Sequence, residues 1–338
     1  MFIEISDYDN AWRQISELIK SKANEETNLK FQNRVITTGG TTAYLKISEG
    51  CSNACTYCAI PAIRGVYKSR KFEDIIEEAK ILVQKGIKEI IVVAQDTTKY
   101  GIDIYGKARL PELLRELSKI DGVIWVRFLY SYPESITAEL IEEVKTNDKI
   151  CKYFDIPIQH ISNEILKKMN RKSTKKSIMK VIQDIRKSIP NVVIRTTLIV
   201  GFPGETKENF NELYNFVKEM EFDKLGVFSY SKEEETPAAK LDKQIHYKVK
   251  KVRNDAIMRL QNEIVHKKLQ NYVGNKYKVV IDGITSDDKF YIARTYMDCP
   301  EVDGVTYIKK RDDDTSLVGR FADCVITDSR GYDLISLF

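Results

Sequence analysis

The chain of 338 residues lacks the features that would tie it to a membrane or to an export route. No stretch approaches the roughly 18 consecutive apolar residues that a membrane-spanning helix needs. The first residues, MFIEISD, are acidic and lack a cleavable signal pattern. The net charge of +5, from 54 basic and 49 acidic residues, is too small to indicate a nucleic-acid binder. We therefore expect a soluble, cytoplasmic protein without a membrane partner.

Cysteine is also scarce, but three of the six cysteines fall within eight residues, as Cys51, Cys55 and Cys58. A cluster with an odd number of cysteines, in a chain without an export signal, disfavours a disulfide framework. No His or fourth Cys stands nearby to close a four-ligand structural zinc site, although zinc stays an alternative. Three soft thiolates with one open position suit a 4Fe-4S cluster. The other three cysteines have no partner at ligand spacing and are expected to be buried and inert: Cys151, Cys299 and Cys324.

From about residue 43, apolar runs alternate with amphipathic stretches. The apolar runs cover 43–47, 89–94, 124–130, 153–156, 192–200 and 225–230. The helical stretches cover 72–85, 111–119, 137–146, 175–188 and 206–220. Near-continuous apolar strands separated by helices predict a parallel sheet that is buried on both faces. Six such units are too few to close an eight-fold barrel, so we expect an α/β fold, a partial (β/α)6 TIM-type barrel with its chemistry after the strand C-termini.

The segments on either side of this barrel have different patterns. Residues 7–20 predict one amphipathic helix, followed by a polar linker. Residues 245–271 predict a long helix with a solvated basic face and with an apolar stripe of Ile245, Val249, Val252, Ala256 and Leu260. After Gly274 the periodicity switches to two, and five short strands predict a small antiparallel five-stranded β-barrel. The expected domains are therefore 1–36, 37–270 and 271–338.

The charge of the C-terminal domain differs from that of the remaining chain. Residues 271–338 contain nine Lys and Arg against twelve Asp and Glu, a net charge of −3, which leaves +8 for the rest. Phosphate binding depends on cationic side chains, so an acidic β-barrel is a poor general RNA-binding surface. It is better suited to a basic protein partner.

The block AYLKISEGCSNACTYCAIPAIRGVYKSR resembles the cluster loop of radical S-adenosylmethionine (SAM) enzymes, and more narrowly that of the methylthiotransferase family. The matching residues are Gly50, Cys51, Cys55, Cys58, Ile60, Pro61, Arg64, Gly65, Ser69 and Arg70. Further similar segments are VAQDTTKYG, FLYSYPESIT, FDIPIQHISNEILKKMNR and TTLIVGFPGET, and residues 271–338 resemble a TRAM domain. The segment ARTYMDCPEVDGVTYI is similar to the branch that methylthiolates the β-carbon of an aspartate in small-subunit ribosomal protein S twelve.

The resemblance implies an enzyme, a transferase, with a 4Fe-4S cluster and SAM as cofactors. Cys51, Cys55 and Cys58 would hold the cluster, whose fourth iron would bind SAM, and reductive cleavage of SAM would give a 5′-deoxyadenosyl radical. An electron donor such as flavodoxin or ferredoxin would be a partner. Full-length family members also have an N-terminal domain with a second cluster, and we expect this chain to hold only its tail, in residues 1–36. Sulfur insertion by this chain alone is therefore in question.

The resemblance and the predicted barrel rim together suggest a set of SAM contacts. Tyr57 would line the adenine or pack under the cluster loop, and the amides of Gln95 and Gln159 would hold polar groups of SAM. Arg195 would pair with a carboxylate, either that of SAM or that of the target aspartate. The two residues that follow the fifth strand would let adenine approach closely: Gly201 and Phe202. His160 is expected to be a structural hydrogen-bonding residue.

Two other functions stay open at this point. The first is the same chemistry on tRNA adenosines, as in MiaB- or MtaB-type enzymes, which would make tRNA the partner. The second is a catalytically incomplete fragment that cleaves SAM, or only binds its partner through the C-terminal barrel. Tight, salt-dependent tRNA binding would favour the first.

Overall fold

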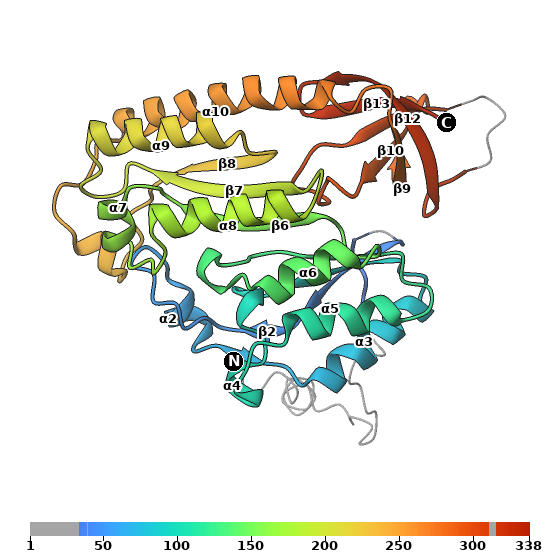
Figure 1. The fold of residues 1–338 in the computed structure, drawn as a ribbon, viewed down its shortest axis with the longest axis horizontal. Helices are drawn as coiled ribbons and strands as arrows, with labels where there is room; N and C mark the ends of the chain where they lie inside the picture. The colour runs from blue at the N-terminus through green and yellow to red at the C-terminus, as the bar shows by residue number, and fades with distance from the viewer. Residues whose placement is uncertain (1–33, 39, 311–315) are drawn as a thin grey trace, which may run out of the picture. The chain divides into compact units, whose positions relative to one another are not determined.

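The computed structural model describes residues 34–38, 40–310 and 316–338, and the chain divides into the units Met1–Val35 and Ile36–Phe338. The helix predicted over 7–20 and the linker after it lie outside the described residues. The second unit contains a partial α/β barrel followed by a closed β-barrel (Figure 1). In the described part, no helix is long and apolar enough to cross a membrane. The three predicted domain boundaries stay predictions.

The partial barrel consists of six parallel strands in two three-stranded sheets, ordered β1-β4-β5 and β6-β7-β8. The strands are β1 (Thr42–Lys46), β4 (Glu89–Val93), β5 (Trp125–Phe128), β6 (Tyr153–Gln159), β7 (Val193–Val200) and β8 (Lys224–Ser229). A parallel bridge between Val126 and Ile150 joins the two sheets. Each of the six predicted apolar runs therefore contains a strand, and the partial (β/α)6 barrel is confirmed.

Five helices alternate with these strands and cover one face of the sheets (Figure 1). They are α3 (Phe72–Gln84), α5 (Leu110–Lys119), α6 (Ala138–Thr146), α8 (Lys175–Ser188) and α9 (Lys207–Met220). Alternate strand residues such as Leu45, Ile156 and Leu198 are fully buried in a core shared with the helices. The opposite side of β7 carries the half-buried residues Arg195, Thr197 and Ile199.

Several short elements surround the carboxyl ends of the strands. They are β2 (Ser48–Glu49), α2 (Ile60–Arg64), β3 (Lys68–Ser69), η2 (Thr97–Lys99), α4 (Ile102–Tyr105), η3 (Pro133–Ser135), α7 (Asn163–Lys168) and η4 (Pro237–Lys240). None of them belongs to the predicted elements, because these short segments are neither continuous apolar runs nor long enough to show a helical period.

The long helix α10 (Tyr247–Gln270) packs on α9 and β8 and reaches β12 (Figure 1). The predicted apolar stripe is wrong in its first half: Val249 and Val252 are 41% and 64% exposed, whereas Leu260 is buried. In this first half of α10, basic side chains face the barrel because they pair with carbonyl and carboxylate oxygens. Lys250 Nζ donates to the Tyr230 carbonyl at 2.7 Å.

The C-terminal barrel is closed, in the order β10-β11-β13-β12-β9. Its strands are β9 (Lys276–Ile284), β10 (Phe290–Thr295), β11 (Thr306–Lys309), β12 (Phe321–Arg330) and β13 (Asp333–Leu337). The predicted five strands are all present, but β11 and β13 pair in parallel. The prediction of a purely antiparallel barrel was therefore wrong at this pair, because the chain passes through β12 before β13 returns beside β11.

The C-terminal barrel packs against the amino-terminal ends of the strands of the partial barrel. Trp125, Tyr153 and Val193 share one buried core with residues of the C-terminal strands such as Val280 and Tyr291. Three cysteines are 1–3% exposed and unpaired, as predicted: Cys151, Cys299 and Cys324.

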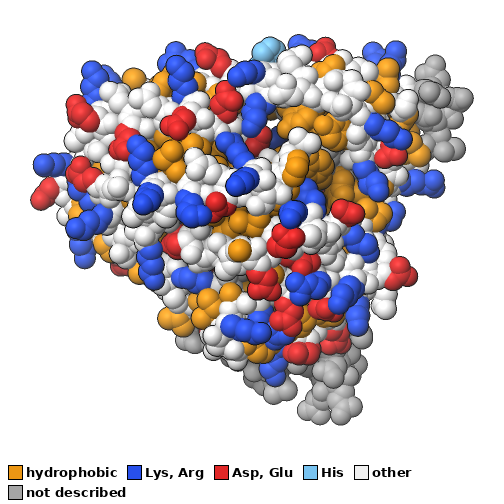
Figure 2. Space-filling view, viewed as in Figure 1, with side chains coloured by type: hydrophobic (Ala, Val, Ile, Leu, Met, Phe, Trp, Pro, Cys, Tyr) orange, Lys and Arg blue, Asp and Glu red, His pale blue; other side chains and the backbone are white. Residues whose placement is uncertain are grey.

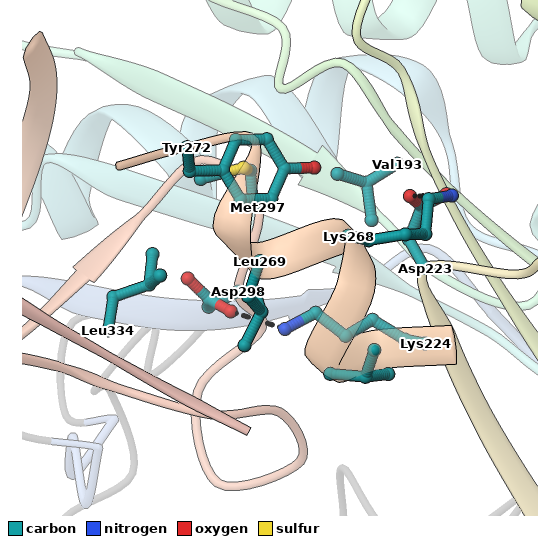
Figure 3. A pocket seen from close by; sticks show the side chains of 10 residues that line it. Val193, Asp223, Lys224, Lys268, Leu269, Tyr272, Met297, Asp298 and Leu334 are labelled. Carbon is teal, nitrogen blue, oxygen red and sulfur yellow. Dashed lines mark hydrogen bonds and ion pairs between the residues drawn. The ribbon is translucent and has the colours of Figure 1, made fainter. Parts of the chain in front are cut away.

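A small cavity lies at this junction, between α10 and the loop after β10 (Figure 3). Its volume of about 20 Å³ is enough for a water molecule and far too small for a nucleotide-sized cofactor. On one side of the cavity, Lys224 Nζ forms an ion pair with Asp298 Oδ1 at 2.6 Å. The cavity is part of the packing between the two barrels, and the candidate site lies elsewhere, at the carboxyl ends of the strands.

Candidate active site

The cysteine loop begins at Gly50, four residues after β1 and directly after the short strand β2. Gly50 has φ of +69°, and a Cβ there would lie 2.2 Å from the Val66 carbonyl oxygen, so the turn into the loop requires glycine. The Cys51 amide donates to the Gly65 carbonyl at 3.1 Å, which closes the loop and α2 into one unit. Cys51 and Cys55 are buried, Cys58 is half-buried, and all three are free thiols.

The segment that follows α7 holds the cysteine loop in place. The Thr56 amide donates to the Met169 carbonyl at 3.1 Å, and Thr56 Oγ1 donates to the Lys168 carbonyl at 2.8 Å. Asn170 Nδ2 donates to the Ala54 carbonyl at 2.8 Å. Residues more than a hundred positions apart in the chain are thus joined around Cys55.

The surroundings of the thiols fit an anionic, sulfur-ligated group. The Asn53 amide donates to Cys51 Sγ at 3.5 Å, and the Arg171 guanidinium donates to Cys55 Sγ at 3.9 Å. Burial raises the pKa of Cys51 and Cys58, so the thiolate forms need a cationic partner to be populated. A metal cluster supplies such a partner, because ligation deprotonates a thiol.

Within the described residues, no group of three His, Cys, Asp or Glu side chains is close enough together to hold a single metal ion. An iron–sulfur cluster makes a different demand on the protein. Each cysteine thiolate binds its own iron, so the sulfurs lie around the cluster and do not converge on one point. The loop of three thiols fits this demand.

The predicted SAM residues Gln95 and Gln159 both lie at the rim next to the cysteine loop. Gln95 comes two residues after β4, and its side-chain oxygen is buried without a hydrogen-bond partner among the described residues. Its neighbour Asp96 accepts from Asn53 Nδ2 at 2.9 Å, which ties this strand end to the cysteine loop. Gln159 is the last residue of β6, has φ of +69°, and donates weakly to the Pro157 carbonyl at 3.4 Å.

Tyr57, Gly201 and Phe202 are also brought together at this rim. Phe202 is the second residue after β7, is fully buried, and belongs to a small apolar cluster against which Tyr57 packs. Burial raises the pKa of Tyr57, which keeps the phenol neutral. The Glu205 carboxylate accepts from the amides of Gly201 and Phe202 and so fixes the turn after the strand.

Arg195 lies far from that turn, as the third residue of β7. Six residues separate it from Gly201, about 20 Å along an extended strand. Its guanidinium donates to Asp155 Oδ1 at 2.8 Å and lies 3.7 Å from Asp303 Oδ1 of the C-terminal barrel. It therefore has carboxylate partners within this chain, and its predicted contact with a ligand carboxylate stays a prediction.

His160 is fully buried after β6, and its Nδ1 accepts from the Ser162 amide at 3.0 Å. The expected structural hydrogen bond is therefore present. Burial lowers the pKa of His160 to about 3, and the nearby positive charge of Arg253 acts in the same direction. Arg253 itself forms an ion pair with Glu205 at 3.2 Å. Burial raises the pKa of Glu205 to about 7.

Sequence reasoning missed two residues that contact the thiols, Arg171 and Tyr132. The hydroxyl of Tyr132 lies 3.7 Å from Cys55 Sγ. Both residues fall inside segments that match the family, FLYSYPESIT and FDIPIQHISNEILKKMNR. Their position in these segments was a usable signal, but nothing in the local sequence places either side chain beside a cysteine.

Comparison with known proteins places the chain in a class that agrees with this geometry. Residues 45–217 match the Radical SAM superfamily, and residues 273–337 match the TRAM domain. The chain is therefore a radical SAM enzyme with a C-terminal TRAM domain, and this class uses a 4Fe-4S cluster and SAM. Methylornithine synthase (PylB), a solved structure, aligns at 14% identity with a TM-score of 0.46, over 76% of this chain and 75% of that one.

Its relatives specify the family within that class. The chain is 59% identical, over 99% of its length, to the ribosomal protein uS12 methylthiotransferase RimO of Alkaliphilus oremlandii, and it covers 76% of that protein. RimO of Clostridioides difficile is 50% identical over 97% of this chain and 74% of the relative. RimO of Clostridium botulinum (strain Okra) is 48% identical over the whole chain and 76% of the relative. The chain belongs to the RimO family of radical SAM methylthiotransferases.

Proposed function

We propose that this chain methylthiolates the β-carbon of an aspartate of ribosomal protein uS12. The observation that carries the proposal is the 59% identity over 99% of the chain to a uS12 methylthiotransferase, together with a free three-cysteine loop at the carboxyl ends of a parallel strand set. The target carbon has an unactivated C–H bond, so radical chemistry suits it. The cluster and SAM, when bound, supply a 5′-deoxyadenosyl radical for hydrogen abstraction.

Cys51, Cys55 and Cys58 are the proposed cluster ligands. Their loop is held by backbone hydrogen bonds at both ends and by the segment after α7, which fixes the three sulfurs relative to the strand ends. Two of the three thiols are buried, and this limits the access of water and oxidants to the metal site.

The proposed SAM contacts are grouped around this loop. The orphaned side-chain oxygen of Gln95 needs a donor, and an ammonium or hydroxyl group of SAM provides one. Gln159 has only a weak contact within the chain, so its amide is available for the same ligand. Tyr57 and Phe202 supply an apolar wall for adenine beside the backbone of Gly201, which has no side chain.

The β-carbon of the target aspartate must meet the 5′-deoxyadenosyl radical beside the cysteine loop, so we propose no contact between the target carboxylate and Arg195. Arg195 lies about 20 Å from the turn at Gly201, towards the opposite end of the strand. Its guanidinium pairs with Asp155 and Asp303 of this chain, and its contact with a ligand carboxylate stays a prediction.

Charge favours a basic protein over RNA as the substrate. Residues 271–338 have a net charge of −3, and on the face shown in Figure 2 acidic and basic side chains are interspersed. A one-electron donor such as flavodoxin or ferredoxin completes the proposed partners. The second cluster of full-length relatives is expected to come from a domain that precedes the part of the relatives covered here.

The test is anaerobic reconstitution with iron and sulfide, followed by incubation with a reductant, SAM and purified uS12. We expect 5′-deoxyadenosine from this chain, and mass spectrometry of uS12 reads out the methylthio group on aspartate once a sulfur donor, the domain with the second cluster, is added. Cys55→Ala should abolish 5′-deoxyadenosine formation, whereas the matched Cys151→Ala, which removes a buried thiol elsewhere, should retain it. Wild-type chain that holds iron yet forms no 5′-deoxyadenosine would overturn the proposal. Tight tRNA binding with a steep salt dependence would favour the tRNA alternative.

A further inference from the structure

Arg171 places a buried positive charge directly beside one of the proposed cluster ligands. It follows α7 and is 7% exposed. One terminal nitrogen of the guanidinium lies 3.9 Å from Cys55 Sγ, and its central carbon lies 4.2 Å from the centre of the Tyr132 ring. The guanidinium of Arg171 therefore lies in contact with both the Tyr132 ring and the Cys55 thiol.

The protein only partly satisfies this guanidinium. Its second terminal nitrogen donates to the Pro157 carbonyl at 2.9 Å, but the buried Nε of Arg171 has no hydrogen-bond partner. Among the described residues, no carboxylate forms an ion pair with Arg171. An uncompensated buried ion costs several kcal/mol, so such a site is stable when an anion offsets the charge.

The neighbouring side chains do not supply that anion. The Tyr132 ring covers the guanidinium, and the Glu134 carboxylate, which acts on Arg171 electrostatically, forms no ion pair with it and accepts from Ser173 Oγ. Cys55, whose Sγ contacts the guanidinium, becomes negative when it ligates a metal cluster. A thiolate-bound cluster at Cys55 would therefore provide the missing counter-charge.

We propose that Arg171 is a positioning residue that offsets the negative charge of the cluster at Cys55 and thereby raises the reduction potential of that cluster. The proposal rests on the cluster assignment made above. Reduction potentials of iron–sulfur clusters depend on net charge, on hydrogen bonds to the sulfurs and on exposure. Adding one electron makes the site more negative, so a fixed buried cation stabilises the reduced form more than the oxidised form.

The experiment is a mediated redox titration of anaerobically reconstituted chain, with the reduced cluster quantified by electron paramagnetic resonance. Arg171→Met removes the charge while keeping an unbranched side chain. We expect about a tenfold lower ratio of reduced to oxidised cluster at a fixed solution potential, which is 59 mV for a one-electron couple. Arg171→Lys keeps the charge and should stay close to wild type. Arg186→Met, on the outer helix α8, is the matched control and should leave the potential unchanged.

The iron content and the reduction potential of the Arg171 variants distinguish a charge role from a structural role. Arg171→Met with full iron content and a wild-type potential would show that Arg171 only braces the loop through Pro157, and the proposal would be wrong. If the Met variant binds no iron, Arg171→Gln takes its place, since an amide can still donate to Pro157. Loss of iron from the Gln variant but not from the Lys variant supports the charge role, and loss from both overturns it.

The same measurement separates this inference from the proposed function. Wild-type chain that takes up no iron contradicts the cluster assignment itself. Wild-type chain with about four irons and a SAM-sensitive spectrum retains that assignment, whatever the Arg171 variants do.

Discussion

His160 illustrates how burial alone sets the chemistry of a single residue in this chain. Its ring is fully buried after β6, and one nitrogen accepts a backbone hydrogen bond. Burial lowers its pKa from 6.5 to about 3. In the unfolded chain the same residue takes up a proton near pH 6.5, so between these two values the unfolded state binds more protons than the folded state.

The stability contribution of neutral His160 is therefore complete above about pH 6.5 and is lost as the pH falls towards 3. Lowering the pH from 7.5 to 5 should cost about 2 kcal/mol of unfolding free energy through this residue. His160→Asn keeps an acceptor for the Ser162 amide and does not titrate, so it should remove that part of the pH dependence. Urea unfolding at both pH values measures it, with the exposed His266→Asn as control. Equal pH dependence in wild type and His160→Asn would contradict the prediction.

At the scale of elements, the cysteine loop depends on a segment far away in the chain. Asn170, just after α7, has φ of +56° and donates its side-chain amide to the Ala54 carbonyl. Asparagine tolerates this left-handed conformation better than alanine does. The residue thus serves both the end of its own helix and the loop that carries the cysteines.

Asn170→Ala should destabilise the chain by about 1–2 kcal/mol through the backbone conformation and should also release the cysteine loop. We expect the reconstituted variant to lose iron several-fold faster than wild type during anaerobic gel filtration. Asn191 has φ of +57° at the turn before β7, so Asn191→Ala carries the same backbone cost at a distant place. Iron loss at equal rates from the two variants would mean that the bond to Ala54 does not matter.

The elements also show what the sequence could and could not predict. The six strands were predictable as near-continuous apolar runs, and the helices between them as amphipathic stretches with a helical period. In the first half of α10 the same rule failed, because the barrel rim offers carbonyl and carboxylate acceptors there and Lys250 and Arg253 turn towards them. The cysteine spacing pointed to the cluster loop, but Arg171 reaches Cys55 across 116 residues, and only the fold brings them together.

At the scale of the molecule, a buried charge network joins the partial barrel to the C-terminal barrel. Glu89 on β4 is fully buried and pairs with Arg127 on β5 at 3.1 Å and with Arg294 on β10 at 2.8 Å. Burial by itself would raise the pKa of Glu89, but the two guanidinium groups hold it below its usual value. One carboxylate thus compensates cations from both barrels, beside the apolar core that they share.

Glu89→Ala should therefore damage the junction more than its size suggests, because it leaves two buried guanidinium groups without their shared partner. We expect a loss of about 3–5 kcal/mol in the free energy of unfolding, measured by urea denaturation of the complete chain. The exposed pair Lys180–Asp184 provides the control, and Asp184→Ala should cost less than about 1 kcal/mol. Because Glu89 links the two barrels, the variant should also lower the stability of the C-terminal barrel. The fluorescence of Trp125 monitors this change, since the centres of the Trp125 and Phe321 rings are 4.8 Å apart. If Glu89→Ala unfolds no earlier than Asp184→Ala, the apolar core alone joins the two barrels.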